Sequence, residues 1–367
     1  MTATHDVVIV GGGAVGAACA RELARTGRRV LVVERGAAQG EGWRAAAGML
    51  APQIEARADD PLLELGLAGR ELYHHLAGPL RESTGIDIGL RQCGILRVAG
   101  TEAEADELWS KVGWQRQQGY LCDWLDEAEV RAEWRWVGPT RGALWAPREG
   151  VLDPGRLVAA LLADARAAGA VVVHDTIRAL DRRGDRIVGV LGAERHVGDQ
   201  VVIAAGAWSG RIDGLPRPLS VEPIRGQMLA LPWPADVEPA IVFGSQCYVV
   251  ARGGEALAGS TMEHAGFAAE VTSAGLARIF NAASALVPAL AGAEVCRTWA
   301  GLRPMTPDGL PIIGREPLVE GLWYATGHGR NGILLAGITG VLLRQLMDGE
   351  TPEEELDGFR PERFWRW

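Results

Sequence analysis

The first 35 residues contain two short apolar runs with a helical pattern between them. Residues 6–10 and 29–33 are short and mostly apolar, as in the buried strands of a parallel sheet. Residues 14–26 carry apolar side chains at helical spacing, and a run of glycines precedes them. The pattern therefore predicts a strand, a glycine turn, a helix and a parallel strand, which together form one βαβ unit.

The same kind of alternation returns in the middle and at the end of the chain. Asp153 and Pro154 suit the cap and the first turn of a helix, and Gly169 suits the position after its last turn. Other apolar patterns predict helices over 62–80, 273–286 and 332–347 and strands over 170–174, 200–204 and 322–326. These recurring pieces predict an α/β fold.

Segments with the period of an antiparallel sheet separate the α/β pieces. Residues 218–262 alternate, residues 86–100 resemble strands, and residues 177–203 resemble hairpins. The Trp-rich stretch after residue 100 has a mixed pattern, whereas residues 301–314 are rich in Pro and Gly and are expected to form a loop. This order predicts two domains, each assembled from discontinuous segments.

Length, charge and cysteine content restrict the classes of function. A chain of 367 residues suits one large domain and a smaller one, and its net charge of −9 does not favour nucleic acid or an anionic membrane as a partner. Five scattered cysteines without a CxxC pair predict neither a disulfide framework nor a metal site. No signal peptide is expected, and residues 333–343 are too short to span a bilayer, so we expect a cytoplasmic protein.

A glycine motif follows the first predicted strand. Gly11, Gly13 and Gly16 form GxGxxG, which allows a tight turn, a close approach of the backbone to a pyrophosphate, and packing of the helix on the sheet. Glu34 ends the next strand, where a carboxylate can accept hydrogen bonds from ribose hydroxyls. A glycine-rich turn with a surface Glu would look similar. The strand, helix and acid together favour a dinucleotide site, without separating NAD from FAD.

A second apolar strand bears on that choice. Residues 201–203 lead into the small residues Ala204, Ala205 and Gly206. Flavoproteins with two dinucleotide-fold segments carry such a strand beside the cofactor, although an ordinary core strand has the same pattern. We therefore expect a Rossmann-like FAD-binding domain and a smaller antiparallel-sheet substrate-binding domain. The first is assigned to residues 1–85, 147–217 and 300–367, and the second to residues 86–146 and 218–299.

Three further stretches carry a family resemblance. They are AAAGMLAP at residues 45–52, WAGLRP at 299–304 followed by TPDG at 306–309, and GHGRNGILL at 327–335. With the glycine motif and the strand before Gly206, the sequence resembles the glycine oxidase family, within the D-amino-acid oxidase and sarcosine oxidase superfamily. The resemblance extends over nearly the whole chain.

The resemblance implies non-covalent FAD and the oxidative deamination of glycine or other small amino acids and amines. Hydride would pass from the substrate to flavin N5, and reoxidation by O2 would give hydrogen peroxide. The family also implies a supply of iminoacetate for thiamine thiazole synthesis, and a homotetramer. Two alternatives stay open: a D-amino-acid or sarcosine-type dehydrogenase with another electron acceptor, and a flavoprotein subunit without turnover.

A substrate site is implied as well. Arg303 matches the family arginine whose planar guanidinium pairs with the substrate carboxylate, and Tyr248 matches a tyrosine near that carboxylate. Arg330 matches a residue near the substrate, which could instead hold the flavin loop. The other residues implied to line the pocket are Met49, Gln246, Met262 and Gly329. A structural Arg, a core Tyr and core Met residues are the competing interpretations.

The implied cofactor residues fall mainly in the glycine turn, around the AAAGML stretch, and in the turn before the last helix. They are Gly11, Gly13, Ala14, Val15, Gly16, Glu34, Arg35, Gly42, Trp43, Ala47, Gly48, Met49, Ile177, Gly206, His328, Gly329, Arg330, Asn331, Gly332, Ile333 and Leu334. The helix that begins near Gly332 would direct its positive end at the N1–C2=O edge of the flavin. No general base is required if the substrate amine has lost its proton.

Several positions depart from the family pattern. Gly329 replaces an aromatic residue, Gln246 replaces a histidine seen in a relative, and Met305 replaces a glycine. The small Gly329 predicts a pocket that accepts substrates larger than glycine. Gly301 stands where the covalent-flavin branch carries its cysteine, so no covalent thioether is expected.

Overall fold

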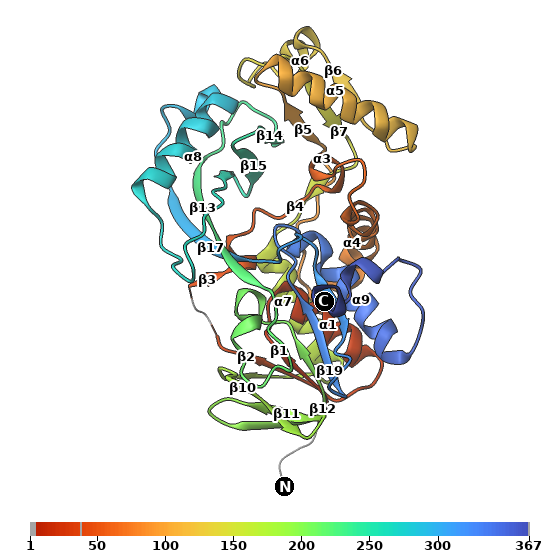
Figure 1. Cartoon of the computed structure of the whole chain (residues 1–367). Helices are drawn as coiled ribbons and strands as arrows, with labels where there is room; N and C mark the ends of the chain where they lie inside the picture. The colour runs from red at the N-terminus through yellow and green to blue at the C-terminus, as the bar shows by residue number, and fades with distance from the viewer. Residues whose placement is uncertain (1–4, 37–38, 366–367) are drawn as a thin grey trace.

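The computed structural model describes residues 5–36 and 39–365, and two large sheets with helices around them dominate it (Figure 1). The helices are α1 (Ala14–Arg25), α2 (Gly42–Ala45), α3 (Pro52–Glu55), α4 (Leu62–Thr84), α5 (Glu102–Gln117), α6 (Glu127–Glu133), α7 (Pro154–Ala167), α8 (Ser273–Leu286) and α9 (Gly332–Asp348). This arrangement confirms the predicted α/β class. Within the described ranges, no helix is long and apolar enough to cross a membrane.

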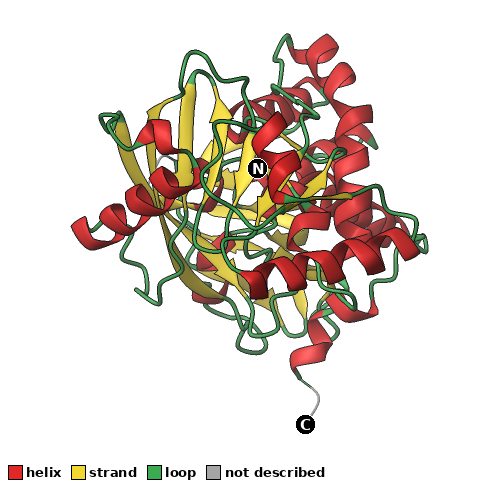
Figure 2. Cartoon of the chain, turned by 90° about the horizontal axis from the view of Figure 1, so that it is seen from above, coloured by secondary structure: helices red, strands yellow, loops and turns green. Residues whose placement is uncertain are grey.

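The first sheet has a parallel centre. Its strands are β1 (His5–Val10), β2 (Val30–Glu34), β9 (Val171–His174), β10 (Ala179–Arg183), β11 (Arg186–Leu191), β12 (Arg195–Ile203), β18 (Ile312–Arg315) and β19 (Leu322–Thr326). Strands β19, β12, β1, β2 and β9 pair in parallel, so their carboxyl ends meet at one edge, where loops form ligand sites in such sheets. Helices α1, α7 and α9 pack together through buried apolar side chains, and much of the helical ribbon lies on one side of the strands (Figure 2).

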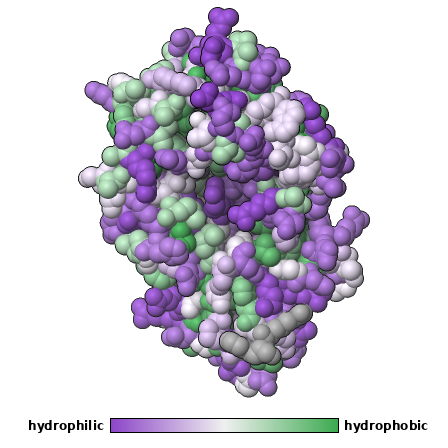
Figure 3. Space-filling view, turned by 45° about the horizontal axis from the view of Figure 1, so that its top comes forward, coloured by the Kyte–Doolittle hydropathy of each residue, from purple (hydrophilic) through white to green (hydrophobic). Residues whose placement is uncertain are grey.

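The second sheet is mostly antiparallel. Its order is β3 (Gly40–Glu41), β17 (Arg297–Met305), β13 (Glu222–Pro232), β16 (Glu255–Gly259), β15 (Tyr248–Arg252), β14 (Ile241–Phe243), β5 (Ile95–Val98), β7 (Ala143–Ala146) and β6 (Asp123–Leu125). A separate pair joins β4 (Met49–Leu50) to β8 (Gly150–Val151). Strand β3 lies in the segment 1–85 that was assigned to the FAD-binding domain, yet it pairs with β17 of this sheet. The predicted boundaries of the two domains stay a prediction. Hydrophilic residues predominate on the face shown in Figure 3, with apolar residues interspersed.

One sequence prediction about local structure was wrong, and one helix was missed. Residues 301–305 belong to β17 rather than to a loop, because β13 supplies hydrogen-bond partners that override the local Pro and Gly signals. Helix α5 lies in the Trp-rich stretch that had no assigned element. Its buried face includes Lys111 and Gln115 beside apolar residues, so the apolar period that marks a surface helix was interrupted.

A buried polar cluster supports α3, which leads into the cavity described below. Glu149 is fully buried, and its Oε1 accepts hydrogen bonds from the backbone N–H groups of Gln53 and Ile54. Lys111 Nζ donates to the carbonyl of Ile54 at 2.8 Å. Burial is the main reason that the pKa of Glu149 is raised to about 8.

We predict that Glu149 makes stability depend on pH. The folded protein keeps this proton to about pH 8, whereas the unfolded chain loses it near the ordinary glutamate pKa of 4.5, so the free energy of unfolding falls as pH rises between these two values. In Glu149→Gln this contribution to the pH dependence of the unfolding free energy is absent. Unfolding of the holoenzyme across this pH range measures the difference. The exposed Glu294→Gln is the matched control. Parallel pH profiles for wild type and Glu149→Gln would contradict the prediction.

Candidate functional site

A cavity of about 550 Å³ is lined by residues from both large sheets. Val10, Val33 and Ala204 line it from the carboxyl edge of the first sheet, and Tyr248 and Arg303 line it from the second. The cavity therefore brings the predicted nucleotide motif and the predicted substrate residues into one space.

The glycine turn at the first-sheet end is sterically specified. Gly11 has φ +105°, and a Cβ there would lie 2.4 Å from the carbonyl oxygen of Ala204. At Gly16 a Cβ would lie 1.9 Å from the carbonyl oxygen of Gly11, so α1 can approach the turn this closely only without a side chain. Gly13 caps α1 without a side-chain hydrogen bond, which leaves N-terminal amides available for an anion.

An acid and an aromatic group lie near this turn. Glu34 lines the cavity at the end of β2, and its Oε2 accepts a hydrogen bond from the N–H of Gly12 at 2.5 Å. The Arg35 guanidinium lies 3.6 Å from the centroid of the Trp208 ring, and Phe267 packs on the same ring. These side chains suit a group with ribose hydroxyls and a flat ring.

The turn before α9 forms another part of the wall. Gly329 has φ +54° and donates its N–H to the carbonyl of Pro304, which fixes the turn against β17. His328 is buried and lies 2.9 Å from Thr339 Oγ1, and burial lowers its pKa to about 3, so its ring is neutral. Asn331 does not cap α9 with its side chain, so the positive end of this 17-residue helix faces the cavity.

Arg303 is a mostly buried cation at the second-sheet end. Its Nη1 donates to the carbonyl of Thr261 at 3.1 Å and its Nη2 donates to Ser260 Oγ at 2.5 Å. A Cβ at Gly226 would lie 2.1 Å from Arg303 Nη1, so this glycine on β13 makes the space for the guanidinium. Arg303 forms no ion pair with any residue that the structure describes. A cation in this setting is prepared to bind a carboxylate.

Tyr248 and Arg330 complete this end of the wall. Tyr248 is buried on β15, and its pKa is raised because desolvation outweighs the opposing charge of Arg303. Its hydroxyl therefore keeps its proton and can donate a hydrogen bond. Arg330 is exposed at the turn before α9, and its Nη2 donates to Glu55 Oε1 at 3.0 Å.

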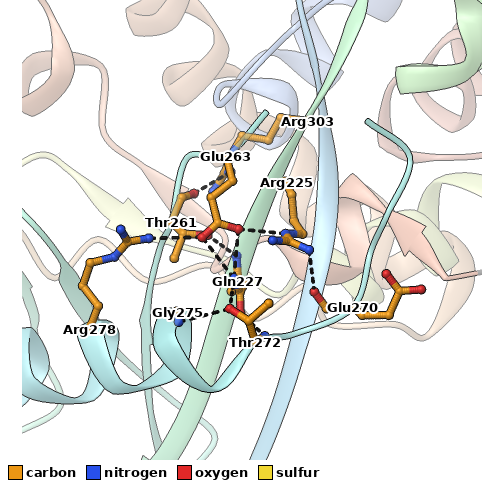
Figure 4. Close-up of polar contacts among 9 residues, drawn as sticks. All are labelled: Arg225, Gln227, Thr261, Glu263, Glu270, Thr272, Gly275, Arg278 and Arg303. Carbon is orange, nitrogen blue, oxygen red and sulfur yellow. Dashed lines mark hydrogen bonds and ion pairs between the residues drawn. The ribbon is translucent and has the colours of Figure 1, made fainter. Parts of the chain in front are cut away.

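A polar network behind Arg303 holds the segment that follows β16 (Figure 4). Gln227 Oε1 accepts from the N–H of Thr272 at 2.7 Å, while its Nε2 donates to Glu263 Oε2 at 2.9 Å. Glu263 also accepts from Arg225 and Arg278. Because Gln227 is fully buried, its amide is a central support of the segment that carries Arg303's partners.

Most predicted site residues line the cavity. They are Gly11, Gly13, Ala14, Val15, Glu34, Arg35, Gly42, Trp43, Ala47, Gly48, Met49, Ile177, Gly206, Tyr248, Arg303, His328, Gly329, Arg330, Asn331, Gly332 and Ile333. Four others lie elsewhere. Gly16 packs behind the glycine turn and Leu334 packs in the apolar core, whereas Gln246 and Met262 are exposed away from the cavity wall. The roles of all these residues remain predictions.

Several cavity residues were missed in the sequence. Trp208 follows the Gly206 strand that the sequence singled out, so its position was the one available signal. Gly226, Ser260 and Glu55 carry no local motif. They reach the cavity only through strand register and the placement of α3.

Comparisons with known proteins agree with this geometry. The family described as FAD dependent oxidoreductase matches residues 6–346. A glycine oxidase from Geobacillus kaustophilus is 38% identical over 366 residues, covering 98% of this chain and 97% of that protein. The crystal structure of glycine oxidase from the same species matches with a TM-score of 0.93 and 36% identity, covering 99% of each chain. A bifunctional protein ThiO/ThiG from Synechocystis sp. is 34% identical over 99% of this chain, which spans 55% of that protein.

We predict that Gln227→Met destabilises the protein. The change keeps the length of the side chain but leaves the N–H of Thr272 and the carboxylate of Glu263 without this partner, at a cost of about 1–3 kcal/mol. Urea unfolding of the holoenzyme measures the loss. The exposed Gln117→Met serves as the control, and equal unfolding free energies for the two variants would show that the network does not support this segment.

Proposed function

The chain belongs to the FAD dependent oxidoreductase family, and from that premise we propose that it oxidises glycine or another small amino acid or amine, with O2 as electron acceptor. The observation that carries the proposal is Arg303, a mostly buried cation on the cavity wall without an anionic partner among the described residues. A buried guanidinium beside a protonated tyrosine hydroxyl favours a small carboxylate as ligand.

The residues at the other end of the cavity fit FAD. Gly11 and Gly13 leave room for a pyrophosphate beside the α1 amides, and Glu34 is placed to accept hydrogen bonds from a ribose. We propose that FAD is bound without a covalent link. In support, no cysteine occurs among the described residues of the cavity wall, and Gly301 stands where the covalent-flavin branch of the superfamily carries its cysteine.

In this proposal the protein supplies orientation. Arg303 binds the substrate carboxylate with two N–H donors, and the Tyr248 hydroxyl donates to the same group. The α9 amides stabilise negative charge at the turn formed by Gly329 and Arg330. When bound, FAD accepts hydride from the substrate Cα and passes the electrons to O2, which gives hydrogen peroxide. A substrate amine that has already lost its proton needs no base from the protein.

The cellular setting belongs to the same proposal. Oxidation of glycine gives iminoacetate, and we propose that this product supplies thiamine thiazole synthesis in the cytoplasm. The similarity to a bifunctional protein named ThiO/ThiG supports that role. We also propose a homo-oligomer, a tetramer by family resemblance.

The proposal is tested by mixing the holoenzyme anaerobically with glycine, sarcosine and D-amino acids while recording the flavin absorbance. Bleaching by at least one of these amines, followed by peroxide formation when O2 is admitted, is the expected result. Reduced flavin that is stable in air would instead indicate a dehydrogenase that uses another acceptor. Flavin that none of the amines bleaches would overturn the proposed function.

We predict that Arg303→Ala retains FAD and loses most activity toward amino acids. Removing one partner of a buried charged pair costs about 2–5 kcal/mol, which lowers kcat/KM roughly 30- to 5000-fold. Steady-state peroxide formation measures the change, and the flavin absorbance reports cofactor content. The exposed Arg166→Ala is the control, and wild-type glycine kinetics in Arg303→Ala would remove Arg303 from the site.

A further inference from the structure

Glu55 is an acidic side chain on the wall of the substrate end. It is the last residue of α3 and lines the cavity together with Tyr248, Arg303 and Arg330. Its side chain is 23% exposed, and its Oε1 accepts a hydrogen bond from Arg330 Nη2 at 3.0 Å. The guanidinium of Arg330 is therefore already paired, whereas that of Arg303 is not.

These charges act on one another. Burial lowers the pKa of Arg303 most, the charge of Arg330 lowers it further, and the charge of Glu55 opposes that change. The charges of Arg303 and Arg330 both act to lower the pKa of the Tyr248 hydroxyl, against the larger effect of burial. Arg303, Arg330 and Glu55 therefore interact electrostatically, and the two cations with one carboxylate leave a net charge of +1 among these three groups. Arg97 also interacts with Glu55, but it does not line the cavity.

The backbone of α3 does not depend on the Glu55 ion pair. Glu149 accepts hydrogen bonds from the N–H groups of Gln53 and Ile54, and the Ile54 carbonyl accepts hydrogen bonds from Lys111 and Arg97. These buried contacts already hold the helix next to the cavity. A partly exposed pair such as that of Glu55 adds little to stability, so its effect is mainly on the charge of the wall.

We propose that Glu55 restricts the enzyme to substrates with a single carboxylate, because it occupies Arg330 and leaves Arg303 as the unpaired one of these two cations. This inference rests on the proposed function. One substrate carboxylate balances the net charge of Arg303, Arg330 and Glu55. A second carboxylate must compete with Glu55 for Arg330 and is repelled by it, in a cavity where partial burial strengthens both effects. Amino dicarboxylates are therefore disfavoured by charge.

The test uses two amines that differ mainly in charge. N-ethylglycine and iminodiacetate share the same backbone, and a carboxylate in iminodiacetate replaces the terminal methyl of N-ethylglycine. We expect Glu55→Gln to raise the ratio of kcat/KM for iminodiacetate to kcat/KM for N-ethylglycine about tenfold or more. If one amine is turned over too slowly, its inhibition constant against the best substrate replaces kcat/KM in the ratio.

Three variants make the result specific. The double variant Glu55→Gln with Arg330→Gln should return the ratio to about the wild-type value, because the freed cation is then absent. Glu55→Ala should act like Glu55→Gln and replaces it if that variant does not fold with FAD. Glu64→Gln is the control, since Glu64 lies outside the cavity wall and accepts a hydrogen bond from Tyr120.

The outcomes separate this inference from the proposed function. A ratio that stays at the wild-type value in both Glu55 variants overturns the inference, and so does an increase that persists in the double variant. If the wild-type holoenzyme oxidises glycine or N-ethylglycine while the ratio does not respond, the proposed function stands and the role of Glu55 is refuted. Failure of every amine to reduce the flavin would refute the function itself.

Discussion

Strand β13 pairs with β17 in an antiparallel register that covers nine consecutive residue pairs, from Glu222–Met305 to Ala230–Arg297. This pairing sets Gly226 beside the guanidinium of Arg303 and places the Ser260–Thr261 segment within reach of both its Nη atoms. On its other edge β17 pairs with β3, which comes from the N-terminal part of the chain. A shift of one residue in this register would turn Arg303 to the opposite face of the sheet and remove the cation from the cavity.

The electrostatics of the cavity follow from that placement. Burial makes the charge of Arg303 costly unless an anion pairs with it, and the cavity offers the space where a substrate carboxylate can enter. Arg330 has its own carboxylate partner in Glu55, so the two guanidinium groups are not equivalent. The uncharged His328 ring and the protonated Tyr248 hydroxyl line the same cavity, and of the two guanidinium groups Arg303 is the one without a carboxylate partner among the described residues.

The two ends of the cavity are held by different physical means. At the first-sheet end the backbone itself forms the site, because glycines allow the β1–α1 turn, the Ala204 carbonyl and α1 to approach closely. At the second-sheet end the site is formed by side chains. The segments that carry these side chains are held by the buried residues Gln227 and Glu149, which do not reach the cavity wall. Between the two ends, the Gly329 turn is hydrogen-bonded to Pro304 and so relates the helix α9 to the strand that carries Arg303.

The sequence by itself determined the βαβ unit, the glycine turn and the carboxylate at Glu34, because strand, turn and helix signals there are local and agree with one another. Through motifs of a known family it also predicted Arg303, Tyr248 and the 328–333 turn as site residues, and these residues line the cavity. Only the tertiary structure decided that residues 301–305 form a strand, that α5 buries Lys111 and Gln115, and that Gln246 and Met262 lie off the cavity wall. Those outcomes, like the pairing of Glu55 with Arg330 across 275 residues, depend on contacts between distant segments, which local propensity and spacing do not encode.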